Sequence, residues 1–294
     1  MSVYSGPLPP SGGVKRPPLA VMAPHWTQFE GAICTSTAHL NVDECGAPEA
    51  IAGVKLLAVD SEDGKLTPAA AERLIVRIGD EHAVQPRVIS ISQATELGTL
   101  YTPEEVLRLS DLAHEHRLLL HVDGARLANA AAALGTSLRA ITTDVGVDLL
   151  SFGGTKNGLL GAEAVVFLAP GIGDGFEYLR KQSLQLASKM RFLSAQLDAL
   201  LTDELWFRSA SHANLMAARL AQGAAALPGV RIMRPVQANA VFARLPHEAI
   251  AALQRDYDFY VWDEPTDEVR WMCSWDTTEE DVDGFVAALE RAVG

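Results

Sequence analysis

The fold is decided by the stretch Leu118-Leu119-Leu120-His121-Val122-Asp123-Gly124-Ala125-Arg126 and by a second stretch, Val147-Asp148-Leu149-Leu150-Ser151-Phe152-Gly153-Gly154-Thr155-Lys156-Asn157-Gly158. Each is an apolar run that ends at a charged residue, which is typical of a short buried strand in an α/β sheet. Ligands of such sheets bind at the carboxyl ends of the strands. The sequence therefore predicts that Asp123 and Lys156 lie together at the mouth of an α/β sheet.

A carboxylate and a lysine in this setting are what pyridoxal 5'-phosphate (PLP) needs. A lysine binds this cofactor as a Schiff base, and a carboxylate keeps the pyridine nitrogen protonated so that the ring can accept electrons. The small residues around Lys156 leave room for a flat group to approach the backbone. The alternatives are a surface lysine in a turn and an Asp123 that only caps the following helix. We predict that Lys156 and Asp123 bind PLP.

Three further residues are candidates for the same site. Arg126 lies one helical turn from Asp123, and its guanidinium suits bidentate binding of a carboxylate, although it could instead pair with Asp123. His39 follows the first strand candidate, where an imidazole could stack on the cofactor ring and move protons, or be a structural residue. Arg270 begins a late strand and is either a surface charge or a second ligand for a substrate carboxylate.

Composition limits the classes of partner. The chain has 294 residues, 48% hydrophobic residues and 21% charged residues, which is enough for one large or two ordinary domains. A net charge of −13 argues against nucleic acid and anionic membranes. Three widely spaced cysteines indicate reduced thiols in a cytoplasm and no metal site. No apolar stretch reaches the roughly 18 residues that span a bilayer.

Strands and helices alternate from about residue 31 to residue 170, which predicts a mostly parallel sheet with flanking helices. Thr67-Pro68 and Thr102-Pro103-Glu104-Glu105 are helix-start signals, the second with a capping-box glutamate. The strand candidates are Gly31–Thr35, Val54–Val59, Val88–Ile91, Leu118–Val122, Leu149–Phe152 and Ala164–Leu168.

The remainder of the chain predicts a small α+β C-terminal domain. Apolar residues at helical spacing over 174–202 predict one long connecting helix. The predicted strands and final helix are Arg231–Met233, Asn239–Arg244, Arg270–Ser274 and Thr278–Ala292. The expected division is an irregular N-terminal arm (1–30), a large PLP-binding domain (31–175), the connecting helix (176–205) and the small domain (206–294).

Taken together, these motifs resemble the threonine aldolase / β-eliminating lyase family, and within it the low-specificity L-threonine aldolases. These are PLP enzymes with the aspartate-aminotransferase fold. The motifs are His39, Asp123-Gly124-Ala125-Arg126, Ser151 to Gly158, and the Arg-Lys-Gln of 180–182. The resemblance implies that His39 stacks on the ring, Asp123 binds its nitrogen and Lys156 forms the Schiff base. It also implies that Thr155 contacts the cofactor and that Arg126 and Arg270 hold the substrate carboxylate.

The resemblance implies cleavage of L-threonine or L-allo-threonine to glycine and acetaldehyde, with His39 or a water as the base. It also implies a homodimer or homotetramer. PLP-dependent β-elimination, transamination and a cofactor-deficient truncated homologue remain alternatives. The family's phosphate-gripping turn has only Ser11-Gly12-Gly13 as its counterpart here, followed by Lys15-Arg16-Pro17-Pro18. Prolines suit a helix poorly beyond its first turn. We therefore expect an altered phosphate site, to which a neighbouring subunit could contribute Arg180, Lys181 or Lys189.

Overall fold

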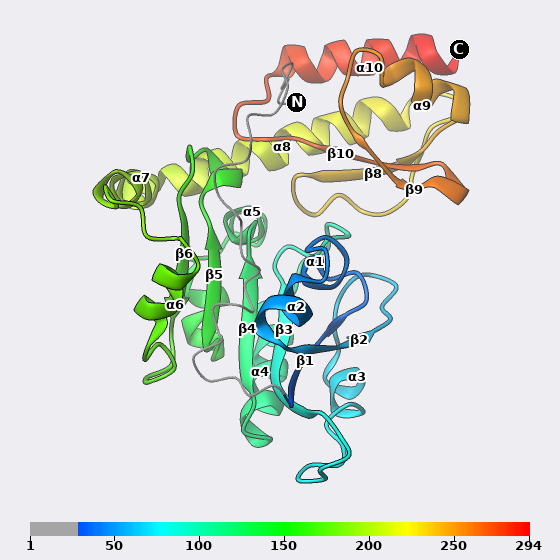
Figure 1. Ribbon diagram of the computed structural model, residues 1–294. Coiled ribbons are helices and arrows are strands. Elements are labelled where there is room, and N and C mark those ends of the chain that lie inside the picture. Colours follow the sequence, from blue (N-terminus) through cyan, green and yellow to red (C-terminus); the bar gives the residue numbers. More distant parts are fainter. Residues whose placement is uncertain (1–28) are drawn as a thin grey trace.

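A six-stranded sheet forms the large unit of the computed structural model, which describes residues 29–294 (Figure 1). Its strands are β1 (Glu30–Thr35), β2 (Lys55–Val59), β3 (Gln85–Ser92), β4 (Leu119–Gly124), β5 (Leu149–Gly153) and β6 (Glu163–Phe167). Their order is β2-β1-β3-β4-β5-β6, and only the β5–β6 pair is antiparallel. The predicted mostly parallel sheet is confirmed.

The connections between these strands contain helices α1 (His39–Val42), α2 (Ala47–Ala52), α3 (Pro68–Glu72), α4 (Pro103–Glu115) and α5 (Leu127–Ala133). Both predicted start signals are confirmed. The Thr67 side chain caps α3, and a complete capping box starts α4. Val106 and Leu109 of α4 are buried in the larger of two apolar clusters that involve the sheet. The smaller cluster packs Leu40 of α1 with Ala32 and Cys34 of β1.

A four-stranded antiparallel sheet forms the small unit. Its strands are β7 (Arg231–Ile232), β8 (Ala240–Arg244), β9 (Tyr260–Asp263) and β10 (Glu268–Met272), in the order β7-β8-β10-β9. Helices α8 (Leu205–Ala225), α9 (His247–Leu253) and α10 (Glu279–Val293) belong to it, and Thr278 caps α10. Val241, Trp271 and Phe285 lie in a separate core. The small α+β unit is confirmed, whereas the domain boundaries stay a prediction.

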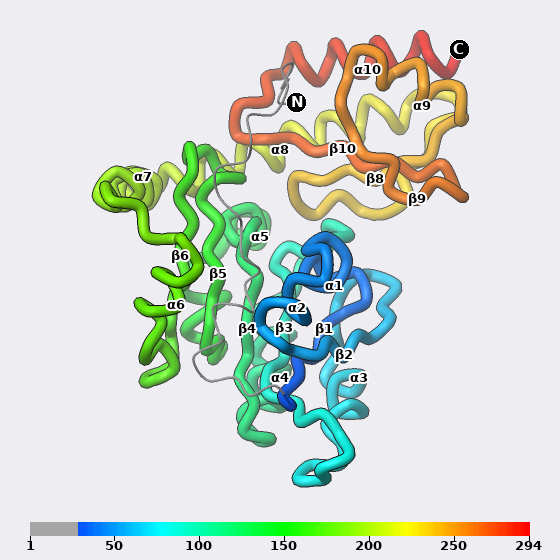
Figure 2. Tube along the Cα trace, viewed as in Figure 1, coloured from blue at the N-terminus to red at the C-terminus, as the bar shows by residue number. Residues whose placement is uncertain are grey.

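The single helix predicted over 174–202 is wrong. The structure has α6 (Phe176–Gln182) and α7 (Arg191–Leu201), with Leu184 between them in the left-handed region at φ 59°. The apolar spacing in the sequence continues through this break, but the leucines there are exposed. The spacing therefore did not indicate a packed helix. The long helix that leads into the small unit is α8, as the trace in Figure 2 shows.

Two smaller corrections concern the small sheet. The strand predicted at Arg270–Ser274 begins two residues earlier and ends at Met272, and β9 was absent from the sequence prediction. The irregular arm predicted for residues 1–30 lies almost entirely outside the described residues. Within residues 29–294, the helices are all too short or too polar to cross a membrane.

Candidate active site

The site lies where the strand order of the large sheet reverses. After β1 the chain forms β2 on one side of β1, whereas β3 and the later strands lie on the other side. Ligands of open α/β sheets bind at such switch points. His39 at the start of α1 and Glu96 after β3 face each other across this point. The backbone N–H of His39 donates to Oε1 of Glu96 at 2.8 Å.

Asp123 lies at the carboxyl end of β4, in register with Ser92 of β3 and Ser151 of β5. Its Oδ1 accepts a hydrogen bond from the Ala125 N–H at 3.0 Å, which fixes the carboxylate while leaving it partly exposed. The alternative role of Asp123 as a helix N-cap is wrong, because Arg126 is the residue that precedes α5 and no side chain caps this helix. The single bond within its own turn leaves most of the acceptor capacity of Asp123 free.

A buried histidine on β4, two residues before Asp123, connects the neighbouring strands. His121 is fully buried, and burial lowers its pKa to about 4. Its ring nitrogens lie 2.8 Å from Ser90 Oγ and 3.0 Å from Ser151 Oγ. The neutral ring ties together β3, β4 and β5, the strands that end at the site.

Lys156 lies in a 3₁₀ turn, Thr155–Asn157, directly after β5. This turn packs against the Asp123 turn so closely that a Cβ on Gly153 would lie 2.6 Å from Ala125 backbone atoms. Glycine is therefore needed here for steric reasons. The charges of both Lys156 and Asp123 act on the pKa of His39, which places these three sequence-predicted residues in one neighbourhood.

Thr155 is anchored by an acidic side chain from β6. Its hydroxyl and its backbone N–H both donate to Oε1 of Glu163, the N–H at 3.1 Å, and the Gly154 N–H donates to Oε2 at 3.3 Å. The Thr155 hydroxyl is thus engaged with protein, and its predicted contact with a cofactor stays a prediction.

His39 is half-exposed, and its Nδ1 lies 2.9 Å from Oε1 of Glu44. This hydrogen bond is the main cause of a raised pKa at His39; burial acts in the opposite direction. The bond to Glu44 also fixes the orientation of the ring, so that Nε2 is the nitrogen left for a ligand or a proton.

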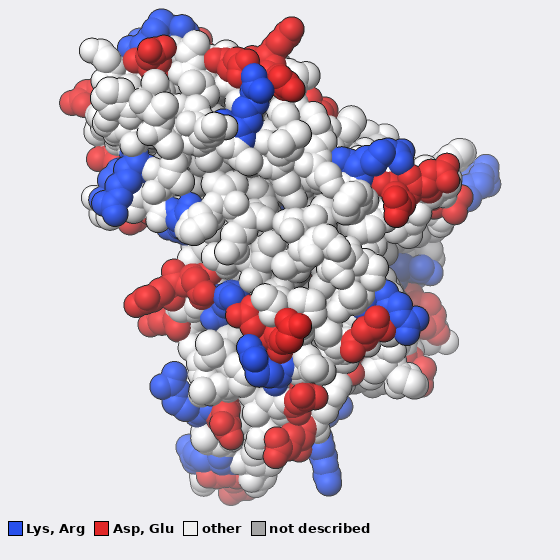
Figure 3. Space-filling view, turned by 180° about the vertical axis from the view of Figure 1, so that it is seen from behind, with Lys and Arg blue, Asp and Glu red and all other residues white. Residues whose placement is uncertain are grey.

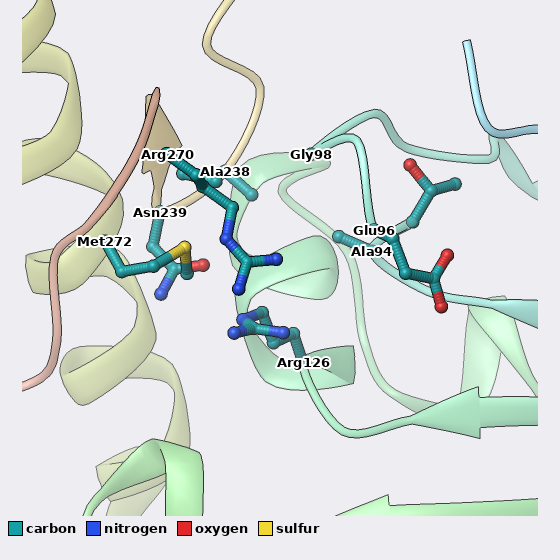
Figure 4. A pocket seen from close by; sticks show the side chains of 10 residues that line it. Ala94, Glu96, Gly98, Arg126, Ala238, Asn239, Arg270 and Met272 are labelled. Carbon is teal, nitrogen blue, oxygen red and sulfur yellow. The ribbon is translucent and has the colours of Figure 1, made fainter. Parts of the chain in front are cut away.

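Arg126 lies between β4 and α5 of the large unit and Arg270 lies on β10 of the small sheet, and the two line one pocket with Asn239 and Met272 (Figure 4). The Arg270 guanidinium lies over the Trp262 ring at 4.6 Å, and its buried Nε has no hydrogen-bond partner. Burial, followed by the charge of Arg270, lowers the pKa of Arg126 to about 10. Within the described chain neither guanidinium forms an ion pair with a carboxylate, so the pair is suited to an anionic ligand.

Sequence reasoning missed Glu96 and Asn239, which line the same pocket. Glu96 lies shortly after β3, and Asp123 lies in the last two residues of β4, so the strand-end argument could have identified Glu96. Asn239 precedes β8 and has no such signal; its Nδ2 donates to the Cys273 carbonyl at 2.7 Å. The predicted turn at Ser11-Gly12-Gly13 lies outside the described residues, and Arg180 and Lys181 lie on α6 beside the β6 edge of the sheet (Figure 1).

Comparisons with known proteins agree with this geometry. The family model for β-eliminating lyases matches residues 19–247. Two proteins named low specificity L-threonine aldolase, from a Pseudomonas species and from Pseudomonas aeruginosa, are 45% and 46% identical over 267 and 268 residues. In each case the match spans 90% of this chain and 77% of the relative.

Solved structures give the same result. A threonine aldolase structure from Leishmania major superimposes with a TM-score of 0.86 at 34% identity, covering 94% of this chain and 81% of that one. An aspartate aminotransferase from Thermus thermophilus, at 18% identity and a TM-score of 0.68, covers 94% and 73% and shows the fold alone. With its matching family model, relatives and site geometry, this chain belongs to the β-eliminating lyase family.

Proposed function

We propose that this chain is a PLP-dependent carbon–carbon lyase that cleaves L-threonine and L-allo-threonine into glycine and acetaldehyde. The observation that carries the proposal is the position of Asp123 and Lys156 at the ends of neighbouring strands, together with Arg126 of the large unit and Arg270 of the small one in a shared pocket. The names of the Pseudomonas relatives support the choice of threonine.

The residues present fit PLP. Lys156 supplies an amine in a turn where close backbone packing leaves only small side chains, and Asp123 has a carboxylate oxygen free for a protonated ring nitrogen. His39 lies in the same neighbourhood with one ring nitrogen engaged by Glu44. When bound, PLP accepts the electron pair released at the substrate Cα.

The chain's own residues bind and orient the amino acid. Lys156 would hold the cofactor through Nζ, and Asp123 would keep the ring nitrogen protonated. Arg126 and Arg270 would bind the substrate carboxylate, because two guanidinium groups with depressed pKa values gain most from a compensating anion. A carboxylate fixed at two points restricts rotation of the substrate and orients its Cα–Cβ bond.

Two further expectations belong to this proposal. We propose a homodimer or homotetramer that acts on small amino acids, and a location in the cytoplasm. The second rests on cysteine usage, since Cys34, Cys45 and Cys273 are free thiols.

Assay of the purified protein with PLP and L-threonine tests the proposal. We expect equal amounts of glycine and acetaldehyde, and loss of both in Lys156→Ala. Formation of ammonia and a 2-oxo acid without glycine would instead indicate β-elimination, and formation of a 2-oxo acid only when an amino acceptor is added would indicate transamination. Either result would contradict the proposed reaction.

A further inference from the structure

The two oxygens of the Glu96 carboxyl group have different surroundings. Oε1 accepts hydrogen bonds from Ser92 Oγ at 2.6 Å and from the His39 N–H at 2.8 Å. Oε2 is buried and has no hydrogen-bond partner among the described residues. A buried, unpaired carboxyl oxygen is costly, so its retention calls for a functional explanation.

Glu96 lines the same pocket as the two arginines. Figure 4 shows the guanidinium groups of Arg126 and Arg270 between Glu96 on one side and Asn239 and Met272 on the other. Glu96 forms no ion pair with either arginine, since neither guanidinium lies within 4.0 Å of it. An amino acid whose carboxylate is bound by the arginines would place its β-substituent in the pocket that Glu96 also lines.

Two other titratable groups at this edge of the sheet, His39 and Asp123, have competing roles. His39 is paired with Glu44, which favours the protonated ring and makes it a poor proton acceptor. Asp123 would be engaged by the ring nitrogen of the cofactor. Glu96 is the remaining carboxylate of the pocket.

We propose that Glu96 is the catalytic base that accepts the β-hydroxyl proton of the substrate, a role that rests on the proposed aldol cleavage. The proton moves from the hydroxyl to Oε2, and the O–H electron pair becomes the second C–O bond of the aldehyde. The Cα–Cβ bond breaks, and its electron pair stays with the Cα fragment, which bound PLP stabilises. In the reverse direction the protonated Glu96 returns the proton to the aldehyde oxygen.

The electrostatics agree with this assignment. Burial raises the pKa of Glu96, and the charge of Asp123 raises it further, while the hydrogen bonds from Ser92 and His39 oppose the shift. A carboxylate with a raised pKa is a stronger base than an exposed one. The rate of cleavage should therefore rise with pH as Glu96 ionises.

The experiment compares Glu96→Gln with Glu115→Gln, a change at the exposed end of α4 outside the site. Two ligands are used with the PLP-loaded proteins, L-threonine for turnover and glycine for binding, the latter followed by the absorbance of bound PLP. Glycine has the amino and carboxylate groups but no β-hydroxyl. Glu96→Gln should lower kcat/KM for threonine by roughly 10²-fold or more. It should change the glycine dissociation constant by less than about threefold.

The shape of the pH profile gives a second readout. The parent and Glu115→Gln should show the acidic rise in kcat/KM, Glu96→Asp should keep it at a lower rate, and Glu96→Gln should lose it. The inference is overturned if Glu96→Gln cleaves threonine at close to the parent rate, or if glycine binding weakens in parallel with turnover. A parent enzyme that releases no acetaldehyde would overturn the proposed function itself, which separates the two failures.

Discussion

The negative charge of Asp123 is the part of the site that a single-atom change can remove. Asp123→Asn keeps the size of the side chain but, on the proposed assignment, leaves the ring nitrogen of bound PLP without its counter-charge. We expect glycine formation from threonine to fall by roughly 10²-fold or more. A rate that stays within about threefold of the parent would contradict the assignment.

Arg270 is expected to act mainly in substrate binding. Arg270→Lys keeps the charge but loses the planar, two-pronged donor set and the stacking on Trp262 and Tyr260. We expect kcat/KM for threonine to fall by roughly 10- to 100-fold, mainly through a higher KM, with PLP retained. An unchanged KM would show that Arg270 does not contact the carboxylate.

His39 should respond to the removal of Glu44. The pKa of His39 is raised in the folded protein, so its pairing with Glu44 stabilises the fold. This stabilisation is complete below the ordinary histidine pKa of 6.5 and is lost as the pH rises through the raised pKa of the folded state. Glu44→Gln should therefore lower the pKa of His39 in an NMR titration. His247, whose pKa is raised by Asp267, is the internal control and should not change. A His39 pKa unaffected by the substitution would refute the pairing.

Sequence reasoning placed three candidate residues at the ends of recognisable strands. Asp123, Lys156 and His39 were found because a charged or polar residue after an apolar run is a local signal, and the structure places them together. Glu96 carries the same kind of signal, but the strand predicted here ends at Ile91, and four residues separate that end from Glu96. Its unpaired oxygen is a property of three-dimensional packing and has no counterpart in the sequence.

The capping box of α4 tests how local signals stabilise an element. Thr102 Oγ1 accepts from the Glu105 N–H at 3.3 Å, and Glu105 Oε2 accepts from the Thr102 N–H at 2.8 Å. Thr102→Ala should lower the free energy of unfolding by about 1 kcal/mol, whereas Thr102→Ser, which keeps the hydroxyl, should cost much less. Denaturant titration of the two variants measures the difference. Equal stabilities would show that the cap is dispensable.

Helices and strands could be predicted where the apolar residues that set the sequence pattern are also the residues that are buried. The six strands of the large sheet are apolar and bounded by polar or small residues, so their positions were found within a few residues. The prediction of one helix over 174–202 was wrong because exposed leucines in this segment have the same spacing as those of a packed helix. Leu184 is 89% exposed, so the pattern did not report burial there. β9 was missed because it is a short strand of four residues in which Tyr260 is exposed and the other three are only partly buried.

The whole molecule presents a surface in which acidic and basic side chains are interspersed, as Figure 3 shows for one face. Against this background, large apolar side chains are exposed on the β5–β6 connection and on the α6–α7 segment. They are Leu160, Tyr178, Leu184 and Phe192. Exposed apolar groups of this size mark interaction surfaces in many soluble proteins.

We therefore expect self-association through this segment. Light scattering should give the mass of a dimer or tetramer, and Leu184→Glu should reduce it, whereas Leu107→Glu, at an exposed apolar position on α4, should not. A monomeric parent would contradict the predicted assembly.

We propose that Lys156 holds PLP at the carboxyl ends of β4 and β5. Reduction of the PLP-loaded protein with borohydride, followed by peptide mass mapping, tests it directly because reduction makes the lysine–cofactor bond permanent. We predict one phosphopyridoxyl group per chain, on the peptide that contains Lys156, and no such label in Lys156→Ala. A label on another lysine, or one spread over several lysines, would contradict the account.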